Sequence, residues 1–207
     1  MTTLLEYNSH EYNILLNAFQ NTKLDKWIAQ NIESFIYEWK EERYDNGNLK
    51  KRYLTRFGEK EGEYKSWWEN GQLYIHCYYK EGKEEGEYKL WFENGQLEIH
   101  CYYKEGKMEG EFKRWFDNGQ LWFHCNYKEG KEEGEYKMWH SNGQLSVHCY
   151  PKEGKREGEF WQWFDNGKIS VHCYFKEGEK EGEYKSWDEE GALIKDDVYH
   201  NGEKINI

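Results

Sequence analysis

Along most of the chain, aromatic and aliphatic side chains alternate with charged ones in short runs that end at glycine. In residues 86–104, the runs GEYKLW and LEIHCYYK follow this alternation, which is the period of a half-buried β-strand. Asn94-Gly95 and Glu105-Gly106 separate successive runs. An Asn-Gly pair is the strongest short signal for a two-residue type I′ turn, and Glu-Gly is a weaker one. The pattern therefore predicts β-hairpins joined into an antiparallel meander.

The predicted hairpins recur with a fixed period, and the unit reads GEYKxWFENGQLxIHCYYKEGKxE. The evenly spaced glycines that begin the units are Gly62, Gly86, Gly110, Gly134, Gly158 and Gly182. They are 24 residues apart, and a constant period of this length is the signature of a repeat array. The first copy, near residues 38–61, and the last, in which Asp196-Asp197 replaces His-Cys, are degenerate, as terminal caps often are. We therefore expect a mostly β protein: an elongated single-layer meander of seven hairpin units over residues 37–207.

If both turns are two-residue loops, Tyr88 lies opposite Cys101, Phe92 opposite Leu97, and His100 beside Glu111. One face then carries Tyr88, Phe92, Leu97, Ile99, Cys101 and Tyr103. The other face carries Glu87, Lys89, Trp91, Glu98, His100 and Tyr102. This register shifts the sheet by two residues per unit, so it predicts a tilted, coiled sheet. The apolar face predicts either a filled aromatic groove or the pairing of two chains as a homodimer.

Residues 1–36 do not share the period. Apolar residues at helical spacing predict a short helical cap, with one helix near residues 9–19 and another over residues 22–36. We expect this cap to cover the open edge of the first strand. The alternative interpretation is a small adaptor module that recruits another protein.

Composition narrows the classes of partner. The net charge is −11 and no basic patch stands out, which disfavours nucleic acid and makes an anionic membrane a less favoured partner. An aromatic content of 19 % does not fit a disordered chain. The first residues lack the basic and apolar regions of a secretory signal. Five evenly spaced cysteines favour reduced thiols, so we expect an intracellular, reducing compartment such as the cytoplasm.

Five adjacent His-Cys pairs suggest a metal protein at first sight, but strand geometry favours a structural role. Adjacent strand residues point to opposite faces, so His100 and Cys101 cannot share one ion. Equivalent histidines two strands apart are separated by about 9.6 Å, too far for a shared tetrahedral site. We therefore expect neither metal nor cofactor.

The tryptophan column is expected to stiffen the sheet by packing, with its exposed ring edges open to a partner. The candidate partner-binding residues combine tryptophans and histidines that recur along the array. They are Trp67, Trp91, Trp115, Trp122, Trp139, Trp163, His76, His100, His124, His148 and His172.

No catalytic motif for acyl transfer, phosphate binding or metalloproteolysis is present, so the chain is not expected to be an enzyme. The unit G-E-Y-K-x-W-(F/W)-x-N-G-Q-L, followed by G-K, resembles the variant form of the MORN repeat over residues 38–205. Bacterial antitoxin-like proteins and many proteins of large DNA viruses carry that variant, and a viral origin implies the host cytoplasm.

The resemblance implies an elongated, twisted sheet that acts as an interaction or scaffolding module. From it and the surface pattern we expect a non-enzymatic scaffold for an unidentified protein partner. The alternatives are a peripheral phospholipid-binding module and an antitoxin-like inhibitor of a partner enzyme.

Overall fold

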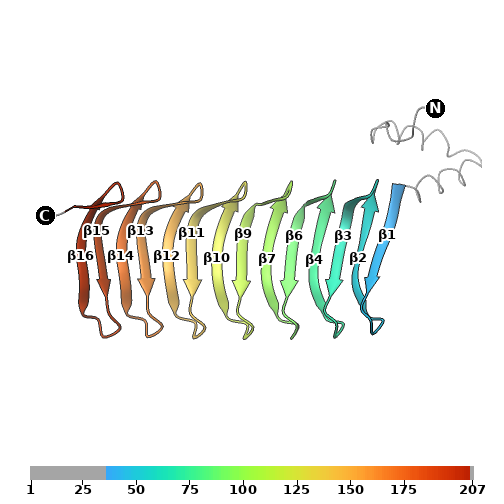
Figure 1. Cartoon of the computed structure of the whole chain (residues 1–207), viewed down its shortest axis with the longest axis horizontal. Helices are drawn as coiled ribbons and strands as arrows, with labels where there is room; N and C mark the ends of the chain where they lie inside the picture. Colours follow the sequence, from blue (N-terminus) through green and yellow to red (C-terminus); the bar gives the residue numbers. More distant parts are fainter. Residues whose placement is uncertain (1–35, 206–207) are drawn as a thin grey trace, which may run out of the picture.

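The computed structural model describes residues 36–205, which form a single antiparallel sheet of 17 strands (Figure 1). The strands pair in chain order, as a meander predicts. The predicted helices near residues 9–19 and over residues 22–36 lie outside the described residues, apart from Ile36. The strands are β1 (Tyr37–Arg43), β2 (Leu49–Arg56), β3 (Glu59–Trp67), β4 (Leu73–Lys80), β5 (Lys83–Glu84), β6 (Gly86–Trp91), β7 (Leu97–Lys104), β8 (Lys107–Met108), β9 (Gly110–Trp115), β10 (Leu121–Lys128), β11 (Lys131–Trp139), β12 (Leu145–Lys152), β13 (Lys155–Trp163), β14 (Ile169–Lys176), β15 (Glu179–Trp187), β16 (Leu193–His200) and β17 (Glu203–Ile205).

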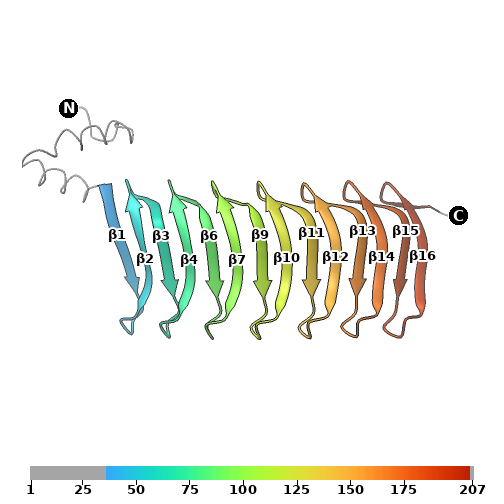
Figure 2. The same ribbon diagram turned by 180° about the vertical axis from the view of Figure 1, so that it is seen from behind.

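The sheet is open and elongated, and no second layer packs on it within residues 36–205, as the views from both sides show (Figures 1 and 2). The predicted fold class is therefore confirmed. With no opposing layer, few side chains are fully enclosed. The most buried apolar side chains among the described residues are the five cysteines, each at most 4 % exposed. They lie between neighbouring aromatic rings, where a small apolar side chain fills the available space.

Of the two turns predicted in each unit, the structure confirms the one with the weaker sequence signal and not the one with the stronger. Glu105 and Gly106 both have positive φ, 52° and 78°, and they form the two-residue type I′ turn between β7 and β8. At Asn94-Gly95 only the glycine has positive φ, 83°. Here the Phe92 N–H donates to the Gln96 carbonyl and the Gly95 N–H to the Phe92 carbonyl, each at 2.9 Å. The prediction of a type I′ turn at Asn94-Gly95 is therefore wrong, because this is a longer loop.

A bulge at the start of each unit removes the predicted two-residue shift. His100 lies opposite Lys89 on one side and opposite Lys113 on the other, so the expected pairing of His100 with Glu111 is wrong. Tyr103 pairs with Met108 and His100 with Lys113, so the strand that contains Gly110 has two more residues between these pairs than its partner. Gly110 lies among them, and its φ of 82° suits a bulge. Each unit therefore regains the register of the one before, and the loop edges run parallel to the long axis (Figure 1).

A second bulge, of one residue, places two side chains on the opposite face from the one predicted. Trp91 lies opposite Leu97 and Leu90 opposite Ile99, so Glu98 is the extra residue. Leu97 therefore joins the face of Trp91 instead of the apolar face. The Glu98 carboxylate moves to the other side of the sheet, where it accepts two hydrogen bonds from the Arg114 guanidinium.

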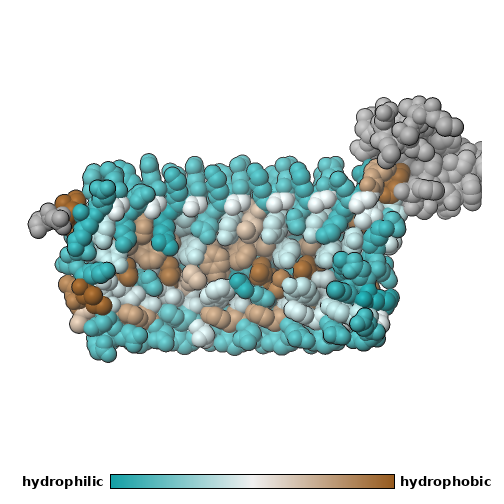
Figure 3. All heavy atoms as spheres, in the orientation of Figure 1, coloured by the Kyte–Doolittle hydropathy of each residue, from teal (hydrophilic) through white to brown (hydrophobic). Residues whose placement is uncertain are grey.

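The two faces have distinct chemistry. The cysteine face consists of Tyr88, Leu90, Ile99, Cys101, Tyr103 and their equivalents, and its rings form contacts such as Tyr88–Tyr103, with centroids 5.6 Å apart. The histidine face consists of Glu87, Lys89, Trp91, Leu97, His100, Tyr102 and their equivalents. Figure 3 shows one side of the sheet, where apolar residues form a band along the long axis between two hydrophilic loop edges.

Side chains at both loop edges tie each unit to the next. The Asn94 carboxamide oxygen accepts from the Gln96 N–H at 2.9 Å, and its nitrogen donates to the Asp117 carbonyl one unit further on, at 3.1 Å. At the opposite edge, the Glu85 carboxylate accepts from the Glu105 N–H at 2.8 Å. The sequence pattern predicts the turns but not this role: each recurring loop position serves the neighbouring unit as well as its own turn.

Candidate partner-binding face

Lysine and histidine alternate along one cross-strand line of the histidine face. Each member lies opposite the next on the neighbouring strand, at the strand spacing of about 4.8 Å. In order across the sheet, this lysine–histidine column consists of Arg52, Lys65, His76, Lys89, His100, Lys113, His124, Lys137, His148, Trp161, His172, Lys185 and Asp196. The histidines that the sequence marks as candidates therefore belong to one continuous line.

A row of glutamates runs beside the column and accepts hydrogen bonds from it. The Glu87 carboxylate lies 2.7 Å from Lys89 Nζ and 2.9 Å from His100 Nε2. Hydrogen bonding to Lys89, followed by that to His100, holds the pKa of Glu87 below its ordinary value against the opposing effect of burial. Glu63, Glu111 and Glu135 make the same pair of contacts in their own units. We call one lysine–histidine pair of the column, together with its glutamate, a rung. Each of these regular rungs thus presents both signs of charge.

Tryptophans line the other side of the column. Trp91 lies opposite Leu97, so a leucine separates each tryptophan from the next equivalent one. Within residues 36–205 no ring contact joins successive members of this row, so the indole rings do not stack directly on one another. The tryptophans are half-buried and leave part of each ring accessible beside the column. The row consists of Trp67, Trp91, Trp115, Trp139 and Trp163.

Trp122 lies apart from the other candidates. It occupies the one-residue bulge of its unit, and the Arg114 guanidinium sits over its ring at 4.5 Å. Arg114 faces Phe123, whose ring packs on Phe112 of the cysteine face. Trp122 is therefore on the opposite side of the sheet from the histidine candidates and cannot contact the same partner surface.

One rung of the column is aromatic. Trp161 replaces the lysine and stacks on the His172 imidazole, with centroids 3.6 Å apart and planes 12° apart. His172 Nε2 lies 3.7 Å from the Glu159 carboxylate, farther than the equivalent distance at His100. The column therefore changes from a charged to an apolar character near β13 and β14.

The cysteines and histidines lie on opposite faces and form no joint site. Burial raises the pKa of the Cys101 thiol to about 12, so the thiol is protonated and a poor nucleophile at neutral pH. Residues 36–205 contain no group of three or more potential ligands placed to hold a metal ion. No helix among these residues is long and apolar enough to cross a membrane.

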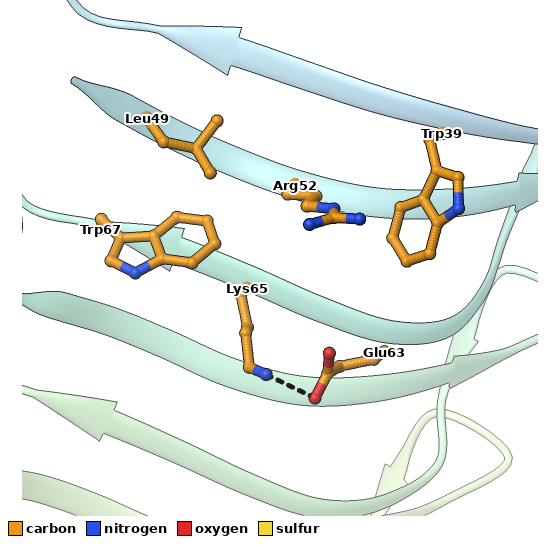
Figure 4. A pocket seen from close by; sticks show the side chains of 6 residues that line it. All are labelled: Trp39, Leu49, Arg52, Glu63, Lys65 and Trp67. Carbon is orange, nitrogen blue, oxygen red and sulfur yellow. Dashed lines mark ion pairs between the residues drawn. The ribbon is translucent and has the colours of Figure 1, made fainter.

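A hollow lies on the histidine face at the end of the array formed by β1, β2 and β3 (Figure 4). Its volume is about 300 Å³. Two indole rings and a leucine provide apolar walls, and two cations and a carboxylate provide polar groups. The lining residues are Trp39, Leu49, Arg52, Glu63, Lys65 and Trp67. Of these six residues, only Trp67 is among the partner-binding candidates predicted from the sequence.

The repeat matches a known family. The family description "MORN repeat variant" applies to residues 60–81, 84–105, 108–129, 132–150 and 180–201, together just over half of the chain. The first hairpin and all of residues 151–179 fall outside these matches. No curated protein matches the chain significantly. The period, the single-layer hairpin sheet and these matches agree: the chain belongs to the MORN repeat variant family.

Proposed function

We propose that this protein is a non-enzymatic scaffold that holds another protein against its histidine face. MORN repeats are binding modules for proteins or membranes and are generally not catalytic. The observation that carries the proposal is the unbroken register of the lysine–histidine column. It presents the same charged and aromatic groups from β3 to β12 on a face that nothing covers within residues 36–205.

The chemistry of this face suits a polypeptide better than an anionic membrane. Each lysine of the regular rungs has a glutamate within hydrogen-bonding distance, as Lys89 has Glu87 at 2.7 Å. The local charge is therefore balanced, whereas recruitment to anionic lipid relies on clusters of unpaired cations. The adjoining row of tryptophans and leucines provides apolar contact area, and aromatic rings are enriched at protein interfaces. The five unpaired cysteines suit a reducing, intracellular setting.

Site-specific cross-linking tests the proposal. Benzoylphenylalanine at Trp115 places a photoreactive group on the histidine face, and the same group at Phe112 provides a matched control on the cysteine face. In cells of the source organism, we expect one defined protein to cross-link from Trp115 and not from Phe112. The variant K89Q/H100Q/K113Q, which removes three consecutive column side chains, should abolish this product while circular dichroism shows an intact sheet.

Other outcomes assign other functions. Cross-links to many unrelated proteins, or equal cross-linking from both faces, contradict the proposal. Sedimentation with anionic but not neutral vesicles, lost in high salt and in K89Q/H100Q/K113Q, makes the protein a lipid-binding module instead. If the cross-linked protein is an enzyme that this chain inhibits at one-to-one stoichiometry, the scaffold acts in the manner of an antitoxin.

A further inference from the structure

We propose that the hollow at the first rung binds a single carboxylate group of an extended peptide, together with the apolar side chain next to it. The inference rests on the proposed function, since it names a chemical feature of the protein partner. The inference is based on the first rung, where the residues at the histidine, lysine and glutamate positions differ from those of the regular rungs.

Three substitutions convert an ordinary rung into this hollow. Arg52 occupies the place of the histidine, one repeat before His76, and Trp39 occupies the place of the glutamate. Glu41 occupies the place of the lysine. Arg52 therefore lacks the carboxylate beside it that His100 has in Glu87. Instead, its guanidinium carbon lies 4.4 Å from the centroid of the Trp39 ring.

The Arg52 guanidinium retains hydrogen-bonding capacity. Its one carboxylate contact within residues 36–205 is from Nε to Glu41, at 3.6 Å, which is too long for a good hydrogen bond. About half of the side chain is exposed, 49 %. Figure 4 shows the guanidinium between the two indole rings of the hollow, Trp39 and Trp67. A planar guanidinium in this setting suits bidentate recognition of a carboxylate.

A second cation and two apolar walls complete the hollow. Lys65 lies opposite Arg52 on the adjacent strand, and its ammonium group is 2.6 Å from Glu63. Trp67 and Leu49 provide the apolar surface at the other end (Figure 4). A volume of about 300 Å³ is at the lower limit for ligand sites, so it suits one amino-acid residue better than a larger cofactor.

Charge favours a carboxylate over a phosphate. Arg52 and Lys65 contribute two positive charges, and Glu41 and Glu63 contribute two negative ones. A singly charged carboxylate can take the open guanidinium hydrogen bonds at little electrostatic cost. A doubly charged phosphate meets two nearby carboxylates and no excess of positive charge, which disfavours it.

The test uses N-acetyl-L-phenylalanine as a probe that carries one carboxylate next to an aromatic side chain. Its amide and inorganic phosphate serve as comparison ligands. The readout is the indole N–H signals of Trp39 and Trp67 in ¹H–¹⁵N spectra of the full chain. We expect the carboxylate probe to shift these two signals and to leave Trp139 unchanged. The amide should bind at least about tenfold more weakly, because it loses a charge-assisted hydrogen bond.

Matched variants test the chemistry of the hollow. W39E/R52H rebuilds the regular glutamate–histidine rung, so it should keep the sheet intact and abolish the response. Arg52→Lys retains the charge but not the planar fork, so it should weaken binding several-fold. Arg114→Gln, on the opposite face, should have no effect.

Three results overturn the inference: equal binding of the amide, an undiminished response in W39E/R52H, or a response to phosphate in place of the carboxylate. The scaffold proposal is tested separately, by cross-linking from Trp115. If the probe fails while that cross-link persists, only the carboxylate site is refuted.

Discussion

The glycine at the start of each unit offers the sharpest test of the register. Gly110 has a φ of +82°, and a Cβ atom built on it meets no heavy atom within 4 Å. Replacing it with alanine therefore adds no steric clash. The whole effect of Gly110→Ala on stability comes from the cost of the left-handed backbone and from the reduced freedom of the unfolded chain.

These two contributions can be estimated. A left-handed conformation costs an L-residue roughly 1–2 kcal/mol. Alanine also lowers the conformational entropy of the unfolded chain, which stabilises the folded state by about 0.4–1 kcal/mol. The net loss is therefore about 1 kcal/mol, which corresponds to a fall of roughly 2–4 °C in Tm for a chain of this size. Equivalent glycines are two strands, about 9.6 Å, apart, so G86A/G110A/G134A should lose about 3 kcal/mol.

Thermal unfolding followed by circular dichroism measures the loss, and amide hydrogen exchange locates it. We expect faster exchange in residues 102–113 of Gly110→Ala. Asn126→Ala is the control, because Asn126 is exposed beside the next bulge and has no positive φ; it should change stability by less than about 0.5 kcal/mol. If Gly110→Ala is as stable as the parent chain, the bulge does not require the left-handed backbone and the register argument fails.

Three further predictions concern the loop edges, the thiols and the glutamates. Asn94→Ala removes the hydrogen bond to the Asp117 carbonyl and should cost about 0.5–1.5 kcal/mol; hydrogen exchange should rise in the loops of both units, and a rise in one loop alone contradicts a link between units. Cys101 is 2 % exposed and its pKa is raised to about 12, and the other four cysteines are buried in the same way. None of the five thiols should therefore react with Ellman's reagent at pH 8 until urea is added. Fast reaction of the native chain would show that the thiols are not enclosed. The pKa of Glu87 is lower in the folded chain than its ordinary 4.5 because of Lys89, so its contribution to stability is present above pH 4.5 and is lost as the pH falls through the folded pKa. Tm measured from pH 7 to pH 3.5 should therefore fall less in Glu87→Gln than in the parent chain, and identical profiles exclude this contribution.

The sequence allowed the period, the hairpins and the single-layer sheet to be predicted, because alternation and evenly spaced glycines are local signals. The register could not be predicted by assuming regular strands. Gly110 recurs within a predicted strand, and a glycine at such a position marks a bulge. Treating it as an ordinary strand residue produced the shift of two residues per unit. It also produced the pairing of His100 with Glu111.

The candidate site shows the same limit. The histidines and the tryptophans of the regular row were correctly placed on a common face. Lys89 and His100 pair as they would in a regular hairpin, since the bulge at Glu98 lies nearer the loop than this pair, and Trp91 alternates regularly with Lys89 on its own strand. Trp122 was grouped with them because its residue type matches, although its position within a bulge sends it to the other face. The hollow at Arg52 was missed because the first unit was regarded as degenerate. Comparing Trp39 and Arg52 with their equivalents in the next unit reveals the change of chemistry.

The restored register also has a consequence for how such a protein changes in evolution. Because each unit ends in the alignment in which it began, recombination between similar copies can add or delete one whole unit and leave both flanks correctly paired. Each event changes the length of the rod by about 9.6 Å. An insertion of odd length within a strand turns every later side chain of that strand to the wrong face. The number of repeats therefore sets the length of the proposed partner-binding surface, which can change by whole units without any new contact between units.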